Sequence, residues 1–141
     1  MDTDLYGELI THLPDNLVRH VYIVDYGVSN IRSVQNAVHF LGYTSIVVAD
    51  GQSLATGNPN TPIILPGVGR FGPAMSELHV RDLSSVLINR ASIDRTPILG
   101  ICLGFQLLMS TSAESVSEPG LGLIPIEVLP LAECGWSGPV P

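Results

Sequence analysis

A short segment around a cysteine, Gly100-Ile101-Cys102-Leu103-Gly104, has the residue types and spacing of a nucleophile site. It lies where an apolar, strand-like run meets a predicted helix. Glycines on both sides of Cys102 allow the sharp turn of a nucleophile elbow, the G-x-S-x-G arrangement with Cys in place of Ser. Such a turn exposes the sulfur, and the start of the next helix favours its thiolate. The alternative is a buried structural cysteine, and the five residues alone leave both interpretations open.

A second glycine-rich segment, Pro66-Gly67-Val68-Gly69, follows the preceding predicted strand. Glycines let backbone N–H groups turn toward a ligand, and such a loop can bind an anion. From a neighbouring strand end, this loop could supply one oxyanion donor while the N–H of Leu103 supplies another. An ordinary turn is the competing interpretation.

Three polar side chains are further candidates. Asp25 ends a predicted strand in the segment 25–30, where its carboxylate could act in catalysis or could tie down a turn. Gln106 and Glu114 follow Cys102 along the chain and could hold a polar substrate, with a solvent-facing position as the alternative for both. Neither Cys102 nor Cys134 has the spacing of a zinc site, so we expect no metal and no other cofactor.

The histidines do not supply an evident general base. A cysteine nucleophile is ordinarily activated by a histidine that a third group orients. His12 and His20 fall in a predicted N-terminal extension, and His39 and His79 fall in predicted helices away from the strand ends. We interpret all four as surface or packing residues, so we expect the base to be missing.

Strand-like and helix-like stretches alternate along most of the chain. The predicted strands span 21–25, 44–48, 62–65, 97–101 and 121–129, and the predicted helices span 31–41, 73–90 and 103–110, with a polar loop over 50–61. This alternation predicts an α/β fold with three layers, a largely parallel sheet carrying helices on both faces. Because carboxyl ends of parallel strands share one edge, we expect the turns after Asp25, Leu65 and Ile101 to meet there.

Composition excludes several classes of protein. The chain has 141 residues and a net charge of −7, with 45% hydrophobic and only 13% charged residues. That balance suits a folded domain and disfavours a nucleic-acid or anionic-membrane surface, which needs clustered positive charge. No apolar run approaches the roughly 18 residues of a membrane helix, and the acidic start is not that of a secretory signal. We therefore expect a cytoplasmic location.

Taken together, these segments resemble the class I glutamine amidotransferases, and among them the glutaminase subunits of imidazole glycerol phosphate synthases. The similarity extends from about residue 21 to residue 129 with order and spacing kept. The matching stretches are Ile23-Val24-Asp25-Tyr26-Gly27 with Asn30, Ile64-Leu65-Pro66-Gly67-Val68-Gly69 with Phe71-Gly72 and Ala74-Met75, Pro97-Ile98-Leu99-Gly100-Ile101-Cys102-Leu103-Gly104-Phe105-Gln106-Leu107-Leu108, and Gly120-Leu121-Gly122-Leu123-Ile124-Pro125.

The resemblance implies a glutaminase. The nucleophile would attack the side-chain amide of glutamine, form a glutamyl thioester and release ammonia, and water would then free glutamate. The matching positions are Cys102 for the nucleophile, the backbone of Val68 and Leu103 with Gly67 and Gly69 for the oxyanion hole, and Gln106 and Glu114 for the substrate.

The resemblance also implies a partner. The ammonia would pass through a channel into a (β/α)₈ cyclase of histidine biosynthesis, and the glutaminase would be nearly inactive until that subunit is docked and carries its ligand. Gly67 would permit the switch, since a glycine lets the following peptide turn its N–H inward.

The sequence departs from the family pattern in three places. Residues 1–20, which we expect to be disordered, have no counterpart, and Ser29 stands where a second glycine is usual. The His-Pro-Glu segment that supplies base and orienting acid is absent. We therefore expect residues 21–141 to form the N-terminal two thirds of the domain, without glutaminase activity of their own. The alternatives are an amidotransferase serving a different synthase, a truncated non-catalytic paralogue, or another Cys-elbow hydrolase, which the segment 66–69 disfavours.

Overall fold

The structure, a computed structural model, describes residues 19–135. The expectations for residues 1–18, His12 among them, and for residues 136–141 lie outside this range. No helix within it is long and apolar enough to cross a membrane. The described strands are β1 His20–Val24, β2 Thr44–Val48, β3 Ile63–Gly67, β4 Ile98–Cys102, β5 Met109–Ser112 and β6 Ile124–Val128, and the helices are α2 Ile31–Phe40, α3 Gly51–Ala55, α4 Phe71–Val80, α5 Leu83–Ser92 and α6 Leu103–Leu107.

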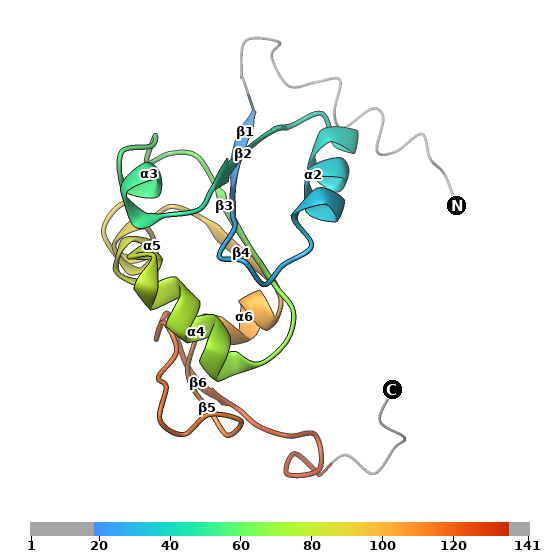
Figure 1. Cartoon of the computed structure of the whole chain (residues 1–141), viewed down its shortest axis with the longest axis vertical. Helices are drawn as coiled ribbons and strands as arrows, with labels where there is room; N and C mark the ends of the chain where they lie inside the picture. The colour runs from blue at the N-terminus through green and yellow to red at the C-terminus, as the bar shows by residue number, and fades with distance from the viewer. Residues whose placement is uncertain (1–18, 136–141) are drawn as a thin grey trace.

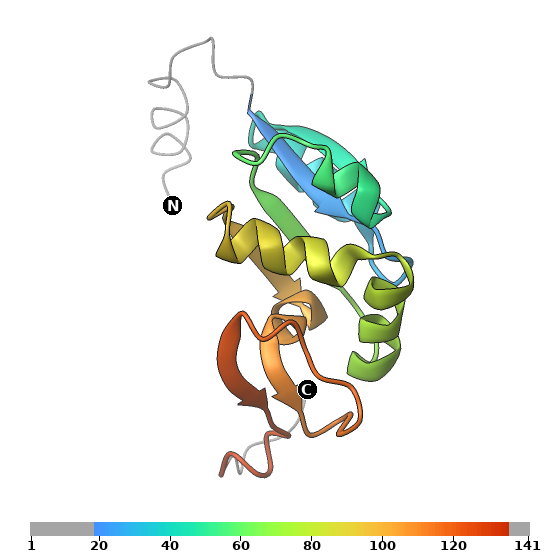
Figure 2. The same ribbon diagram turned by 90° about the vertical axis from the view of Figure 1, so that its left-hand side faces the viewer.

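The main sheet has four parallel strands in the order β2-β1-β3-β4. β5 and β6 form a second, two-stranded parallel sheet, which lies below the main sheet in Figures 1 and 2. The predicted α/β class with a largely parallel sheet is confirmed. The carboxyl ends of β1, β3 and β4 lie at one edge, and each of these strands leads there into one of the three glycine-containing turns.

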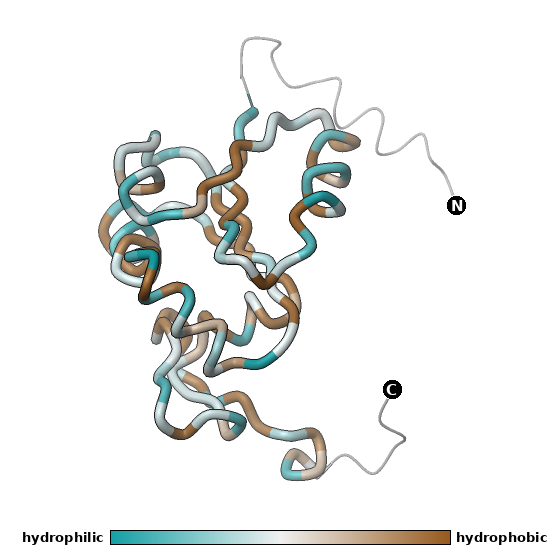
Figure 3. The backbone as a smooth tube through the Cα atoms, in the orientation of Figure 1, coloured by the Kyte–Doolittle hydropathy of each residue, from teal (hydrophilic) through white to brown (hydrophobic). Residues whose placement is uncertain are grey.

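β1 is buried on both faces because its residues alternate between two clusters. Tyr22 and Val24 pack in the larger cluster with side chains of α3, α4 and α5, whereas Val21 and Ile23 pack with Val38 of α2. Figure 1 shows α2 on one side of the sheet and α3, α4 and α5 on the other, and Figure 3 shows the hydrophobic character of the central strands. This two-sided burial explains the continuous apolar run of β1.

The first turn of α2 follows directly from its sequence. Asn30 caps the helix, since its side-chain oxygen accepts the N–H of Ser33 at 3.3 Å. At the other end Gly42 adopts a φ of +78°, the left-handed conformation that ends helices. The core begins slightly earlier than predicted, because His20 already belongs to β1.

Three element predictions are wrong. The polar loop contains α3, which begins because the Asp50 carboxylate accepts the N–H of Ser53 at 2.7 Å. The predicted helix over 73–90 is two helices, α4 and α5, because Asp82 between them adopts a left-handed φ of 56°. The helix predicted over 103–110 ends at Leu107, and β5 follows because it pairs with β6, a partner that local periodicity does not reveal.

Candidate active site

Cys102 is the last residue of β4 and directly precedes the five-residue helix α6. It is exposed, and its φ of 54° is a left-handed value that residues with a side chain rarely adopt. A Cβ on Gly100 would overlap the backbone of Phe105, and a Cβ on Gly104 would overlap the carbonyl oxygen of Leu65. The turn therefore needs both glycines and holds an exposed cysteine in strained backbone, which is the geometry of a nucleophile elbow.

The loop 66–69 lies beside this turn, because Gly67 of β3 is the register partner of Cys102. In this conformation, however, the Val68 N–H donates to the Val28 carbonyl oxygen in the loop after β1, with an N···O distance of 2.9 Å. An N–H that is already donating cannot also hold an oxyanion. The Val68 N–H would therefore have to leave the Val28 carbonyl oxygen before it could serve as an oxyanion donor.

Gln106 and Glu114 line the same pocket, so the structure brings these two predicted site residues together. The pocket has a volume of about 330 Å³, and its lining also includes Ser112, Ala113 and residues 128–130, at the carboxyl ends of β5 and β6. Cys102 is not among the lining residues. A pocket of this size suits a ligand as small as an amino acid.

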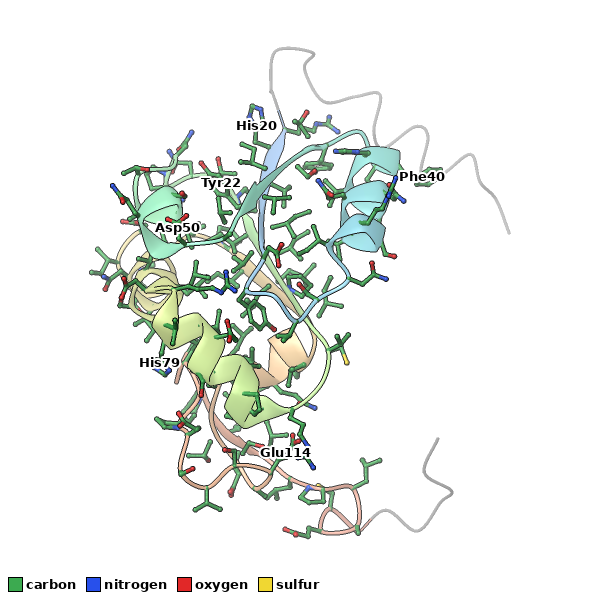
Figure 4. All side chains as sticks on the ribbon, viewed as in Figure 1. His20, Tyr22, Phe40, Asp50, His79 and Glu114 are labelled. Carbon is green, nitrogen blue, oxygen red and sulfur yellow. The ribbon has the colours of Figure 1, made fainter. Side chains whose placement is uncertain are left out.

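Glu114 connects this pocket to the start of α4. Its carboxylate accepts the N–H of Phe71 at 3.4 Å and lies 4.0 Å from the guanidinium of Arg70. Figure 4 shows Glu114 near the beginning of α4. Arg70 directly follows the loop 66–69. A ligand that contacts Glu114 would therefore also alter the contacts that Glu114 makes at the end of that loop. Sequence reasoning missed Arg70, although its position next to Gly69 was available as a signal.

Asp25 has a structural role here. Its carboxylate accepts the N–H of Gly27 at 3.0 Å, which fixes the turn after β1. Of the two interpretations of this residue, the geometry supports the turn.

His20 and His39 lie at the ends of their elements that are far from the edge that carries Cys102, whereas His79 lies near the end of α4, which packs against the loop after β2. His20 begins β1, and His39 lies in the last turn of α2, with Ser45 Oγ at 3.0 Å from its Nε2. His79 lies in the last turn of α4, and Figure 4 shows both His20 and His79. The structure therefore brings none of these three residues to the Cys102 turn.

Tyr26 is the residue of this edge that sequence reasoning did not single out. Its side chain is fully buried, and its hydroxyl lies against Gly67, since a Cβ on that glycine would overlap it. Burial, and to a smaller extent the negative charge of a Cys102 thiolate, raise the pKa of Tyr26 above its usual range. The phenol therefore stays protonated and keeps a hydrogen to donate.

Comparison with known proteins gives a consistent result. The chain is 43% identical over 111 residues to imidazole glycerol phosphate synthase subunit HisH 1 of Parasynechococcus marenigrum, covering 79% of this chain and 51% of that protein. It is 40% identical over 123 residues to the HisH subunit of Symbiobacterium thermophilum, covering 83% and 56%. The chain thus spans about half the length of the curated relatives it matches.

The fold comparison and the family comparison agree with each other. A crystal structure of a glutamine amidotransferase superposes with a TM-score of 0.66 at 19% identity, covering 77% of this chain and 55% of that one. At that identity the match shows the fold. The family model for glutamine amidotransferase class-I matches residues 22–128, which contain the Cys102 turn, the loop 66–69 and both pocket residues. The chain therefore belongs to the class I glutamine amidotransferase family.

Proposed function

We propose that this chain contains the part of a glutaminase subunit that bears its nucleophile, Cys102. The subunit belongs to an imidazole glycerol phosphate synthase and hydrolyses glutamine to glutamate and ammonia. The observation that carries the proposal is the exposed Cys102 on its strained turn, beside Gly67 of the glycine-rich loop. Similarity to HisH subunits of two different organisms supports this choice among amidotransferases.

Cys102 performs the covalent step. Its thiolate sulfur bonds to the side-chain carbonyl carbon of glutamine, and the carbonyl electrons move to oxygen. These electrons then re-form the carbonyl of a glutamyl thioester while the C–N bond breaks, and the nitrogen takes up the proton that the thiol lost and leaves as ammonia. A water molecule attacks the thioester, releases glutamate and returns the thiol. The backbone N–H of Leu103 follows the sulfur directly and is one oxyanion donor.

The second donor is the Val68 N–H, which must first leave the Val28 carbonyl oxygen. Gly67 and Gly69 permit that movement, because glycine accepts backbone angles that other residues do not. The hydrolase is therefore at rest in the described conformation, and a docked partner subunit shifts the loop toward the active arrangement.

The pocket between Gln106 and Glu114 receives the substrate. Glutamine carries an ammonium group at its α-carbon, and the Glu114 carboxylate attracts it, while the Gln106 amide offers both a donor and an acceptor. The pocket accepts one small zwitterion rather than a peptide, in keeping with its volume of about 330 Å³.

The ammonia passes to a partner cyclase with a (β/α)₈ barrel, and the heterodimer works as a lyase of histidine biosynthesis in the cytoplasm. Glutamine hydrolysis is useful only where ammonia is consumed, so coupling to a synthase gives a reason for the resting conformation of the loop 66–69. A related amidotransferase serving another synthase would require the same chemistry, and the acceptor substrate distinguishes the two.

The test is a Cys102→Ala variant of the gene product in complex with its cyclase. We expect glutamine-dependent synthesis to be lost while ammonia-dependent synthesis continues, because the cyclase still receives its nucleophile from solution. Unchanged use of glutamine by the variant would refute the assignment.

A truncated, non-catalytic paralogue is the second candidate, favoured because the hydrogen bond described for a histidine, that of His39 with Ser45, lies away from the Cys102 turn. The reading frame after the Pro141 codon separates the two. A His-Pro-Glu segment within the next ~100 codons supports the enzyme, since large α/β domains reach that length, whereas a stop codon at position 142 supports the paralogue. For residues 1–141 alone we expect no glutaminase turnover, and glutamate release would reveal another base.

A further inference from the structure

The hydroxyl of Tyr26 is buried without a partner. The side chain is fully buried, and no described residue makes a hydrogen bond with its Oη. Tyr22, which lies on β1 and packs in the same cluster, differs, because its Oη accepts the N–H of Asn58 at 2.9 Å. Buried polar groups are normally paired, since they give up water on folding. A phenylalanine at position 26 would fill the same space without this cost, so the hydroxyl points to a use outside this conformation.

The hydroxyl lies against Gly67 of the loop 66–69 and near the start of α6. A Cβ built on Gly67 would overlap Tyr26 Oη, and the same point is 2.9 Å from the backbone nitrogen of Gly104 and 3.1 Å from the Cβ of Leu103. Tyr26 therefore contacts the loop 66–69 at Gly67, close to the start of α6. Its hydroxyl is therefore close enough to the peptide that follows Gly67 to form a hydrogen bond with it in one orientation of that peptide.

That peptide needs a new donor when it turns. At present the Val68 N–H donates to the Val28 carbonyl oxygen. Turning the Gly67–Val68 peptide moves the N–H toward the Cys102 turn and swings the Gly67 carbonyl in the opposite sense. The carbonyl oxygen then faces the loop after β1, where the Val28 carbonyl repels it. A donor from the same loop is required to make this arrangement stable.

We propose that Tyr26 is a positioning residue whose hydroxyl donates a hydrogen bond to the Gly67 carbonyl oxygen once the Gly67–Val68 peptide has turned. It thereby stabilises the form in which the Val68 N–H serves the oxyanion. In the turned form, this one hydrogen bond gives a partner both to the Tyr26 hydroxyl, which has none in the resting form, and to the Gly67 carbonyl oxygen. This inference rests on the proposed function of Cys102 and adds the group that holds its second donor in place.

The test compares two alkylating reagents on Cys102 of the gene product in complex with its cyclase, the state in which the loop 66–69 is proposed to turn. Iodoacetamide requires only the thiolate, whereas a chloroketone analogue of glutamine passes through a tetrahedral adduct with an oxyanion. We expect Tyr26→Phe to lower the chloroketone rate on the order of tenfold, less than the loss of a direct donor, with the iodoacetamide rate unchanged. Tyr22→Phe is the matched control, since it removes a paired hydroxyl, and it should leave the ratio of the two rates unchanged.

Each other outcome has a definite meaning. An unchanged ratio in folded Tyr26→Phe overturns the role of Tyr26 and leaves the proposed function intact. A lowered ratio in Ser29→Ala alone overturns it too, because Ser29 Oγ is the second buried, unpartnered hydroxyl of this loop. Failure of the chloroketone to modify Cys102 in the parent chain overturns both proposals.

A measurement on the unmutated protein guards against a variant that does not fold. With carbon-13 at the ζ position of every tyrosine, the ζ resonance reports hydrogen bonding of each phenol. Formation of the chloroketone adduct should shift the Tyr26 resonance and leave that of Tyr22 in place. An adduct that leaves the Tyr26 resonance unmoved contradicts the proposal.

Discussion

The Cys102 turn and the loop 66–69 are neighbours in the sheet, both are rich in glycine, and they are held in very different ways. At the turn, Gly100 and Gly104 leave no space for even one carbon atom, so packing against backbone fixes the cysteine. In the loop, Gly69 has open space around it, Val68 is 55% exposed, and its N–H is retained by a single hydrogen bond. One part of the site is therefore fixed by packing, and the other is free to change its conformation.

The largest effect is expected at the fixed part. Gly104→Ala places a Cβ on the carbonyl oxygen of Leu65, and neither is a flexible side chain that can move aside. We expect the free energy of unfolding to fall by about 3 kcal/mol, the upper end of the usual cost of overpacking. Urea denaturation measures it, and a loss below about 1 kcal/mol would show that the turn is not fixed by packing.

Alkaline pH tests the junction between the two parts. The pKa of Tyr26 is raised in the folded state, so its contribution to stability is complete below about pH 10, the value of an unfolded tyrosine, and is lost as the pH rises above it. Relative to Tyr26→Phe, the parent chain should lose up to about 1.4 kcal/mol per pH unit above that point. Unfolding curves between about pH 9 and 11 measure this, with Tyr22→Phe as control. Equal slopes for the parent and Tyr26→Phe would contradict it.

The smallest effect is expected at the open loop. Gly69→Ala meets no neighbouring atom, and only its φ of +99° opposes the substitution. We expect a destabilisation of about 1 kcal/mol, the conformational cost alone. A loss as large as that of Gly104→Ala in the same urea titration would remove the distinction between the two regions.

The sequence predicts those parts of the site that depend on the spacing of residues close together in the chain. The strained turn at Cys102 follows from two glycines at fixed distances from the cysteine, and the cap at Asn30 and the left-handed Gly42 follow from equally local rules. The alternation of strand-like and helix-like segments likewise predicts the parallel sheet, because the periodicity of apolar residues within each segment identifies it as a strand or a helix.

The unpredicted features depend on residues distant in sequence. The bond between the Val68 N–H and the Val28 carbonyl joins two backbone groups, which leave no side-chain signature. β5 exists because β6 pairs with it, and Tyr26 became a site residue only when β1 and β3 brought it against Gly67. The convergence of Gln106 and Glu114 on one pocket was implied by family resemblance, and periodicity alone did not indicate it.

The most direct test of the account is the selectivity of a glutamine-derived chloroketone between the two cysteines. Cys102 and Cys134 are both exposed, so accessibility alone would modify both. Peptide mass mapping after partial reaction should find the adduct at Cys102 at least about tenfold faster than at Cys134, because the proposed oxyanion donors lie beside Cys102, and free glutamine should protect it. Equal labelling of the two cysteines, or no protection by glutamine, would contradict the account.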